Sequence, residues 1–415
     1  MFNINNYKKQ IVKNKSSIVI IFILISLLIS SCTVKQEVQT EKQEIEPKIK
    51  VEPKSALFDK KVNIMLSNFK PGQKVTIRAN TRFESENRWE SYATFIADEN
   101  GIVDISKQKP IEGTYEDIDP VGLFWSMERY EDKDDEFYIS ELDPTYINFT
   151  AEVDGEIVTS TIIERLFVLP EVIRIPVREK GLVGTLFLPS NEGSYPIVIV
   201  LGGSEGGLNE IGAAILASHG YAALALAYFG IEPLPAGLYK IPLEYFKTAI
   251  DWLKSQENID SKKLAVMGGS RGGELTLLLG STFPEIRAVI GYAVSRSAGS
   301  EWTYQGESVG GYISVENING PVLLISGKKD LIWPSSDMSD MVIDRLAKYD
   351  HPYFYKHLSY EGSGHSITIP YVPFYENIDG SVWGGGNAKD NAFASSDSWT
   401  NVLNFLKDNL VNVDS

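Results

Sequence analysis

The sequence contains very little cysteine: Cys32 is the only one among 415 residues. A single cysteine cannot form a disulfide bond within its own chain. Histidine is also scarce, with four residues in all, and no group of cysteine and histidine has the spacing of a zinc site. We therefore expect a protein with no disulfide within the chain, no bound metal ion and no other cofactor.

Positive charge is in short supply as well. Lysine and arginine number 39 against 55 aspartate and glutamate residues, which gives a formal net charge of -16. Such a surface repels the phosphate backbone of nucleic acids. We therefore expect no nucleic-acid binding.

The N-terminal apolar run is too short to cross a membrane. Residues 18–29 are apolar except for Ser26, whereas a membrane-spanning helix needs roughly 20 such residues. Four lysines precede this run, at Lys8, Lys9, Lys13 and Lys15. A positive segment followed by a short apolar one is typical of a signal peptide, and we assign residues 1–32 to it.

The apolar run ends in Ile29-Ser30-Ser31-Cys32. This ending resembles the lipobox of bacterial lipoproteins, in which the cysteine is diacylated and becomes the new N-terminus. The resemblance implies a lipid anchor on the extracytoplasmic face of the bacterial cell membrane, since two acyl chains anchor a protein stably. The alternative is a buried structural cysteine. Residues 33–48 are rich in Glu, Gln and Lys and predict a flexible tether.

The remaining chain is long enough, at 43% hydrophobic residues overall, for two cored domains. Residues 49–169 predict short strands and turns, as in an immunoglobulin-like β-sandwich. In "KVTIRA", Val75, Ile77 and Ala79 alternate onto one face. The stretch "YINFTAEVDGEIVTSTIIERLF" predicts a hairpin with a type I′ turn at Asp154-Gly155.

From residue 170 to residue 415 the pattern changes to alternating strands and helices. "YPIVIVLGG", "KLAVMGG" and "PVLLISG" are almost continuously apolar, which is typical of buried parallel strands. Leu243, Phe246, Ile250 and Leu253 recur at helical spacing. We therefore predict an α/β domain with a doubly wound, mostly parallel sheet, whose site lies beyond the carboxyl ends of the strands.

One serine has the setting of a nucleophile. Gly268, Ser270 and Gly272 match the G-x-S-x-G elbow of α/β-hydrolases. The motif alone is common, so its setting carries the prediction. An apolar strand over 264–267 precedes it and a helix over 274–279 follows, and glycines suit a turn whose backbone crowds against its neighbours. The alternative is an ordinary turn serine.

A serine hydroxyl needs a base that takes its proton. Of the four histidines, His365 fits best, because it lies in a glycine-rich loop late in the chain and completes the order Ser, acid, His. His219 falls in the last turn of a predicted helix, His351 in a turn before a proline, and His357 within a predicted strand.

The acid that orients the imidazole is expected to be Asp330, because it follows the buried strand "PVLLISG" and lies between the serine and the histidine. Asp337 and Asp340 come next and are expected to be solvated carboxylates on a helix.

An oxyanion hole requires backbone N–H groups beside the developing charge. We expect one from Arg271, the residue after the serine, and one from Gly203 or Ser204 in "LGGSEGGL". That loop lacks the Lys-Ser/Thr of a P-loop, so we assign no phosphate binding to it.

Several stretches resemble one family in chain order. "GGSEGGLNE", "LEYFKTAIDWL", "GGSRGGEL", "SGKKDLIWPS" and "GSGHSITIPY" are similar to the catalytic domain of acyl-CoA thioesterases and bile acid-CoA:amino acid N-acyltransferases. "PGQKVTIRA" and "EGTYEDIDPVGLFWSM" resemble that family's N-terminal β-sandwich. The resemblance implies an α/β-hydrolase domain, with Ser270, Asp330 and His365 as nucleophile, acid and base in acyl transfer from a thioester.

Acyltransferases of the bile-acid type carry cysteine at the elbow, whereas many thioesterases carry serine, so Ser270 favours water as the acceptor. Our leading hypothesis is a membrane-tethered, acyl-CoA thioesterase-like serine hydrolase. The alternatives are a carboxylesterase acting on a non-CoA ester, an acyl-CoA:amino acid N-acyltransferase, and a binding lipoprotein without activity. Known members work inside cells, so the predicted export leaves the substrate open. Residues 297–319 and 371–393 are expected to border the acyl pocket.

Overall fold

The structure is a computed structural model that describes residues 46–83, 88–129, 142–190, 192–374 and 382–412. The predicted signal peptide, Cys32 and most of the predicted tether lie outside these residues. None of the described helices is both long enough and apolar enough to span a membrane.

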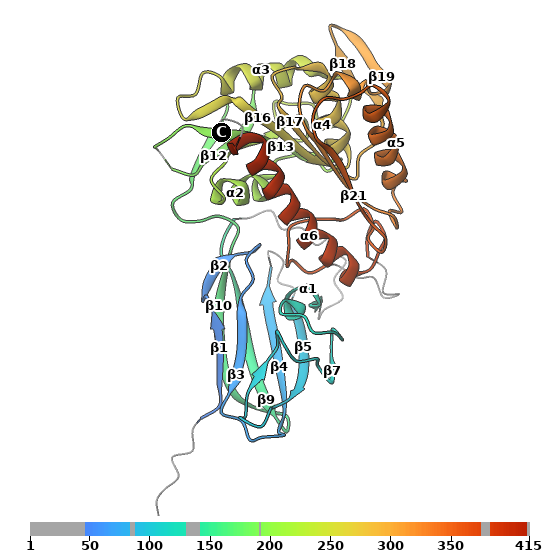
Figure 1. The fold of residues 1–415 in the computed structure, drawn as a ribbon. Helices are drawn as coiled ribbons and strands as arrows, with labels where there is room; N and C mark the ends of the chain where they lie inside the picture. The colour runs from blue at the N-terminus through green and yellow to red at the C-terminus, as the bar shows by residue number, and fades with distance from the viewer. Residues whose placement is uncertain (1–45, 84–87, 130–141, 191, 375–381, 413–415) are drawn as a thin grey trace, which may run out of the picture. The chain divides into compact units, whose positions relative to one another are not determined.

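The N-terminal half of the described chain forms two β-sheets (Figure 1). One sheet has the order β1 (Lys48–Glu52), β3 (Asn63–Ser67) and β6 (Val103–Asp104). The other has the order β2 (Ser55–Leu57), β10 (Glu156–Leu166), β9 (Thr145–Val153), β4 (Lys74–Arg82), β5 (Arg88–Ile96) and β7 (Glu112–Gly113), with β8 (Glu128–Arg129) also paired to β5. A short helix, α1 (Gly122–Trp125), follows β7.

The two sheets share one apolar core, as a β-sandwich requires. Val51 and Ile64 from one sheet and Ile77 and Phe149 from the other belong to the same buried cluster. The alternation predicted for β4 is confirmed, since Val75, Ile77 and Ala79 are all buried.

The predicted hairpin is also confirmed. Strands β9 and β10 pair antiparallel on either side of Asp154 and Gly155. Both turn residues have positive φ, 51° and 85°, as a type I′ turn requires.

The C-terminal half contains the largest sheet of the described residues, with eight strands. Their order is β11 (Ile173–Val177), β12 (Val183–Leu188), β14 (Ala222–Ala227), β13 (Tyr195–Leu201), β16 (Ile259–Gly269), β17 (Ala288–Tyr292), β20 (Val322–Gly327) and β21 (Tyr355–Tyr360). Strand β12 is antiparallel to both of its neighbours, and every later pair is parallel. The sheet is therefore mostly parallel, as predicted.

Helices cover this sheet on both faces (Figure 1). Alternate residues of β13 enter different cores: Val198 and Val200 lie in the cluster that contains side chains of α2 (Glu210–Ser218) and α6 (Ala388–Leu406). Ile197 and Ile199 lie in the cluster that contains side chains of α3 (Leu243–Leu253), α4 (Arg271–Thr282) and α5 (Ser335–Lys348). A strand buried on both sides explains the continuous apolar runs of the sequence, and the predicted α/β-hydrolase class is confirmed.

The segment 297–319 forms structure that the sequence did not indicate. It contains the hairpin of β18 (Ser297–Tyr304) and β19 (Glu307–Tyr312), followed by the short helix η1 (Val315–Asn317). A two-residue strand, β15 (Ile241–Pro242), pairs with β18. The first strands of the large sheet, β11 and β12, were also missed. The chain ends with η2 (Lys407–Val411) directly after α6.

Candidate active site

Ser270 lies on a sharp turn between β16 and α4. Its backbone has φ 55° and ψ -122°, a conformation that an L-residue adopts only under strain. The glycines on either side have a steric reason. A β-carbon at Gly268 would lie 2.6 Å from the Gly272 carbonyl oxygen, and one at Gly272 would lie 2.4 Å from that of Gly202. The strand–turn–helix setting predicted from the sequence is therefore present.

Ser270 is half-buried on this turn. No hydrogen bond joins it to His365 or to any other side chain of the described part of the chain. The next residue, Arg271, is the first of α4, and its backbone N–H consequently has no acceptor within the helix. The predicted oxyanion donor is thus oriented at a helix N-terminus, beside the hydroxyl.

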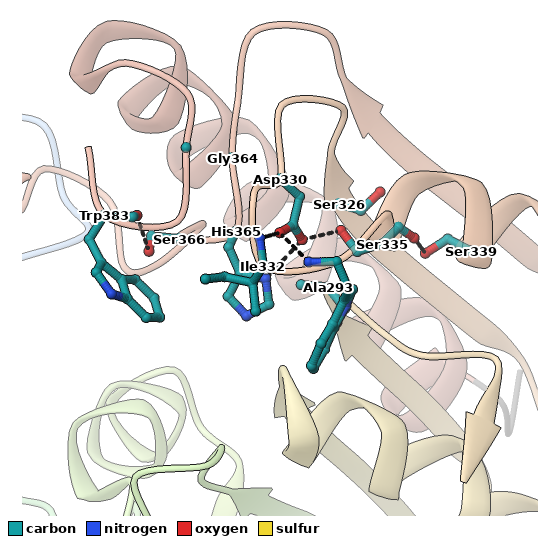
Figure 2. A network of polar contacts seen from close by, with 12 residues as sticks. Ala293, Ser326, Asp330, Ile332, Ser335, Ser339, Gly364, His365, Ser366 and Trp383 are labelled. Atoms are coloured by element: carbon teal, nitrogen blue, oxygen red, sulfur yellow. Dashed lines mark hydrogen bonds and ion pairs between the residues drawn. The ribbon is translucent and has the colours of Figure 1, made fainter. Parts of the chain in front are cut away.

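Asp330 and His365 form a hydrogen-bonded pair. The Nδ1 atom of His365 lies 2.8 Å from Oδ2 of Asp330, and the two side chains are only 6% and 1% exposed. Asp330 follows β20 and His365 lies in the loop after β21, two neighbouring parallel strands. Figure 2 shows the pair together with its polar contacts. The two residues come from loops at the carboxyl edge of the sheet, as the sequence predicts.

Further hydrogen bonds hold the Asp330 carboxylate. The Ser335 hydroxyl donates to Oδ2 at 2.5 Å, and the backbone N–H groups of Ile332 and Trp333 donate to Oδ1 at 2.9 and 3.2 Å (Figure 2). Burial by itself raises the pKa of Asp330, but the hydrogen bonds from His365 and Ser335 outweigh it, and the pKa lies below its ordinary value. Asp330 is therefore ionised at neutral pH.

A glycine turn fixes the loop that carries the histidine. The backbone N–H of His365 donates to the Gly384 carbonyl at 2.9 Å, and that of Gly364 donates to the Asn391 side chain at 2.9 Å. A β-carbon at Gly385, which has φ 96°, would lie 2.0 Å from the Lys329 carbonyl oxygen. The acid loop and the histidine loop thus lie against the same turn. Both Asn391 and this turn lie in the segment 371–393, which the sequence predicted to border the acyl pocket, but neither was predicted to hold His365.

Trp333 connects the histidine to the nucleophile elbow. Its ring lies edge-on to His365, with 5.1 Å between ring centroids, and its Nε1 donates to the Ala293 carbonyl at 3.1 Å. The guanidinium carbon of Arg271 lies 5.9 Å from the same indole. The side chain after Ser270 and the imidazole of His365 therefore contact one common ring.

Two carboxylates hold the Arg271 side chain. Its guanidinium pairs with Glu274 at 2.8 Å and with Glu301 at 3.0 Å. Glu274 is fully buried and also accepts from Trp302 Nε1 at 2.7 Å. The Arg271 charge is consequently neutralised within the protein.

The loop after β13 lies against the elbow. A β-carbon at Gly203 would lie 3.4 Å from the Gly269 carbonyl oxygen, and the Tyr228 hydroxyl donates to the Gly202 carbonyl at 2.7 Å. The Gly203 N–H donates to the carboxylate of Glu205 at 2.7 Å. Neither Tyr228 nor Glu205 was singled out from the sequence.

A second Ser-His-Asp arrangement occurs elsewhere in the same domain. His357 contacts the Ser326 hydroxyl through Nε2 at 2.7 Å and Asp340 through Nδ1 at 2.8 Å. Ser326, however, is fully buried within β20 and does not lie on a turn. A substrate cannot reach its hydroxyl, so we assign this arrangement no catalytic role. Asp340 was expected to be only solvated; it is exposed but also contacts His357.

The remaining histidines have other partners. Nε2 of His219, which follows the last residue of α2, lies 2.5 Å from a buried Asp59 carboxylate oxygen, and Nε2 of His351 lies 3.0 Å from the Gly320 carbonyl oxygen. Within the described residues, no cluster of three or more His, Cys, Asp and Glu side chains is arranged to hold a metal ion.

Comparison with known proteins gives a consistent family. The model of the acyl-CoA thioester hydrolase/BAAT N-terminal region matches residues 59–179. The model of the BAAT/acyl-CoA thioester hydrolase C terminal matches residues 241–311 and 301–412.

Individual relatives match over almost their whole length. A peroxisomal succinyl-coenzyme A thioesterase of Mus musculus is 28% identical, with 86% of this chain and 96% of the relative covered. The acyl-coenzyme A amino acid N-acyltransferase 1 of the same organism is 30% identical, with 86% and 97% covered. Its bile acid-CoA:amino acid N-acyltransferase is also 30% identical, with 88% and 98% covered. The chain belongs to the family of acyl-CoA thioester hydrolases and bile acid-CoA:amino acid N-acyltransferases.

Proposed function

We propose that the protein is a serine hydrolase that cleaves acyl thioesters through an acyl-enzyme on Ser270, with His365 as base and Asp330 as acid. The buried Asp330–His365 pair carries the proposal, because its 2.8 Å hydrogen bond fixes the imidazole tautomer that leaves Nε2 free to accept a proton. The strained turn at Ser270 and the free hydroxyl on it are the second support.

In the first half-reaction, the Ser270 oxygen attacks the carbonyl carbon of the substrate while His365 Nε2 takes the hydroxyl proton. The negative charge that develops on the carbonyl oxygen is held by the N–H of Arg271 and by a second N–H from Gly203 or Ser204. Collapse of this intermediate breaks the carbon–sulfur bond, and His365 returns the proton to the departing sulfur.

In the second half-reaction, His365 takes a proton from a water molecule, which attacks the carbonyl carbon of the acyl-enzyme. The bond between the acyl group and the Ser270 oxygen then breaks, His365 returns the proton to that oxygen, and the free acid leaves. Asp330 stays ionised throughout and stabilises the imidazolium that forms in each half-reaction. The chain's own residues thus supply all the acid–base chemistry of the cycle.

Acyl-CoA is the proposed substrate class, because the names of the relatives specify coenzyme A thioesters. The same relatives include N-acyltransferases, so transfer to an amine is the second candidate function. Ser270 favours hydrolysis over that transfer. The acyl-enzyme on serine is an oxygen ester, which amines attack far more slowly than a thioester. A carboxylesterase acting on a non-CoA ester would use the same three residues.

We expect free acid as the main product when the enzyme is incubated with an acyl-CoA, or with an activated ester, and excess glycine or taurine. Mass spectrometry of the products measures the partition between water and amine. The Ser270→Ala variant, under the same conditions, corrects for uncatalysed aminolysis. A dominant N-acyl amino acid would make the protein an acyltransferase. Rapid cleavage of simple esters with no cleavage of any acyl-CoA would favour the carboxylesterase.

We further propose that Cys32 carries a lipid anchor that holds the enzyme at the extracytoplasmic face of the membrane. The support is the signal-peptide layout of residues 1–32 and the polar tether over 33–48. Replacement of Cys32 by serine should abolish lipid attachment and release the protein from the membrane fraction. Metabolic labelling with a fatty acid and membrane fractionation measure this.

The same variant should keep wild-type activity, because Cys32 lies outside both predicted domains. Ser31→Ala is the matched control, since it alters the neighbouring residue and keeps the thiol. A Cys32→Ser protein that is still acylated and sedimented with membranes would contradict the proposed anchor.

A further inference from the structure

Glu205 accepts a hydrogen bond from a backbone N–H beside the proposed nucleophile. It lies in the loop between β13 and α2, and its Oε1 atom accepts the Gly203 N–H at 2.7 Å. The carboxylate is folded back over the loop so closely that a β-carbon at Gly203 would lie 2.7 Å from its Oε2 atom. A side chain at position 203 would therefore displace the carboxylate from this place.

The backbone of this loop has little freedom to move. After Ser270, a β-carbon at Gly272 would lie 2.4 Å from the Gly202 carbonyl oxygen. Before Ser270, the Gly269 carbonyl oxygen would lie 3.4 Å from a β-carbon at Gly203. The buried Tyr228 hydroxyl donates to the Gly202 and Gly203 carbonyls at 2.7 and 3.3 Å. The Gly203 N–H is thus held in place next to the elbow.

The hydroxyl of Tyr228 stays protonated and can always donate a hydrogen bond. Burial, and then the nearby carboxylates of Glu205 and Glu274, raise its pKa, so it keeps its proton over the whole physiological range. The Glu205 side chain differs from this fixed framework. It is exposed, and no cation pairs with it among the residues that the structure describes. Its single described hydrogen bond is the one from the Gly203 N–H.

On the basis of the function proposed above, we propose that Glu205 is a reversible occupant of the oxyanion site: its carboxylate holds the Gly203 N–H in the free enzyme and leaves when the substrate carbonyl oxygen arrives. A buried N–H needs an acceptor at all times. An oxygen 2.7 Å from that donor occupies the place of an oxyanion, for which donors lie about 2.7–3.1 Å away.

The carboxylate cannot remain while the reaction proceeds. A negative oxygen next to the developing oxyanion would destabilise the charge that the N–H groups are there to hold. Because Glu205 is exposed, its side chain can rotate into water without breaking any other described contact. Every substrate must displace the carboxylate before its carbonyl oxygen can reach the Gly203 N–H. The apparent affinity is therefore the intrinsic affinity multiplied by the fraction of enzyme in which this N–H is unoccupied.

A role as a second catalytic base fits the geometry less well. The Glu205 carboxylate is bonded to a backbone N–H, and the Ser270 hydroxyl has no hydrogen bond to it in the described structure. His365 already has the partner that makes it a base. Glu205 is therefore a positioning residue, which determines how readily the donor accepts a substrate.

The test compares Glu205→Gln and Glu205→Ala with Glu257→Gln in the full-length protein, solubilised in detergent. Glutamine keeps the shape and removes the charge, whereas alanine removes the contact. Glu257 is exposed and precedes β16 at the end opposite the elbow, so its variant controls for the change in net charge. Hydrolysis of p-nitrophenyl butyrate gives kcat and KM, and circular dichroism checks folding.

We expect Glu205→Ala to lower KM about three- to tenfold, with kcat within about twofold, because a hydrogen bond to a charged group no longer competes with substrate. Glu205→Gln should show a smaller decrease in the same direction, and Glu257→Gln none. A trifluoromethyl ketone, which adds to the serine and places an oxyanion in the hole, should bind more tightly to both Glu205 variants by a similar factor.

An unchanged KM and an unchanged ketone affinity in both folded Glu205 variants would overturn the inference. So would a kcat reduced more than tenfold, which would place Glu205 in the chemistry itself. Fluorophosphonate labelling separates these results from failure of the proposed function. If wild type is labelled at Ser270, only the role of Glu205 is wrong; if it is not labelled there, the proposed reaction is wrong.

Discussion

Replacement of Ser270 by alanine should reduce turnover of every thioester and ester substrate by about 10⁴- to 10⁶-fold. The variant loses the attacking oxygen, so no acyl-enzyme can form. The remaining activity comes from direct attack by water on the bound substrate, which the oxyanion donors and substrate binding still assist. Steady-state kinetics on an acyl-CoA, together with intact-protein mass spectrometry for the acyl-enzyme, measure the loss.

The same substitution should leave the fold intact. The Ser270 hydroxyl has no hydrogen-bond partner in the described structure, so its removal leaves no buried group unpaired. Alanine and serine experience similar strain at φ 55°, since each carries a β-carbon. The midpoint of thermal unfolding should therefore change by only a few degrees.

Ser326→Ala is the matched control, because it removes the serine of the second Ser-His-Asp arrangement. Ser326 is fully buried within β20, so we expect turnover within about threefold of wild type, with a modest loss of stability from the unpaired His357 nitrogen. If Ser270→Ala keeps wild-type turnover, or Ser326→Ala abolishes it in a folded protein, the assignment of the nucleophile is wrong.

The sequence predicted the elements that position these residues because each depends on a strong local pattern. Continuous apolar runs indicated the central strands, and the amphipathic spacing of Leu243, Phe246, Ile250 and Leu253 indicated α3, in which all four are buried. Chain order then placed Ser270, Asp330 and His365 after strands that prove to lie in one parallel sheet. Local pattern and chain order together determine that these residues follow the carboxyl ends of strands in the same sheet.

Contacts between distant side chains could not be predicted in the same way. Ser326, Asp340 and His357 meet because β20 pairs with β21 and α5 packs over them, which no local pattern encodes. The sequence order Ser326, Asp340, His357 is even the same as that of the proposed catalytic residues. Burial, which only the structure gives, distinguishes the two sets.

The missed hairpin had a weak local pattern. The hairpin of β18 and β19 contains several glycines, and five of the six residues in β19 are exposed, so it lacks the apolar run of a core strand. The hydrogen bond between Glu205 and the Gly203 N–H depends on the backbone conformation of the whole loop. Such a contact follows from the backbone, and residue type alone does not indicate it.

Replacement of Asp330 by asparagine should lower kcat by about 10³- to 10⁴-fold near neutral pH, with a small effect on KM. The asparagine amide can donate a hydrogen bond to His365 Nδ1. The imidazole then has to carry its proton on Nε2. A histidine in that tautomer cannot take the proton of the Ser270 hydroxyl. The carboxylate that stabilises the imidazolium is also lost. The pH–rate profile of both proteins, measured on one acyl-CoA, gives the size of the effect.

The pH dependence of stability gives an independent measurement. The pKa of Asp330 is lowered in the folded protein, since hydrogen bonds from His365 and Ser335 outweigh the effect of burial. Its stabilising contribution is therefore present above the pKa of an unfolded aspartate, about 3.9, and is lost as pH falls through the lower folded value. Asparagine does not titrate, so the variant should lose less stability than wild type between neutral and acidic pH.

Asp340→Asn is the matched control for this change. Asp340 pairs with His357 in the same way as Asp330 pairs with His365, at 2.8 Å in each case, but its side chain is exposed and its partner is not the proposed base. Its substitution should leave kcat within about threefold of wild type. If Asp330→Asn retains more than a tenth of wild-type kcat, or Asp340→Asn loses as much activity as Asp330→Asn, then the carboxylate that orients the catalytic imidazole has been assigned to the wrong residue.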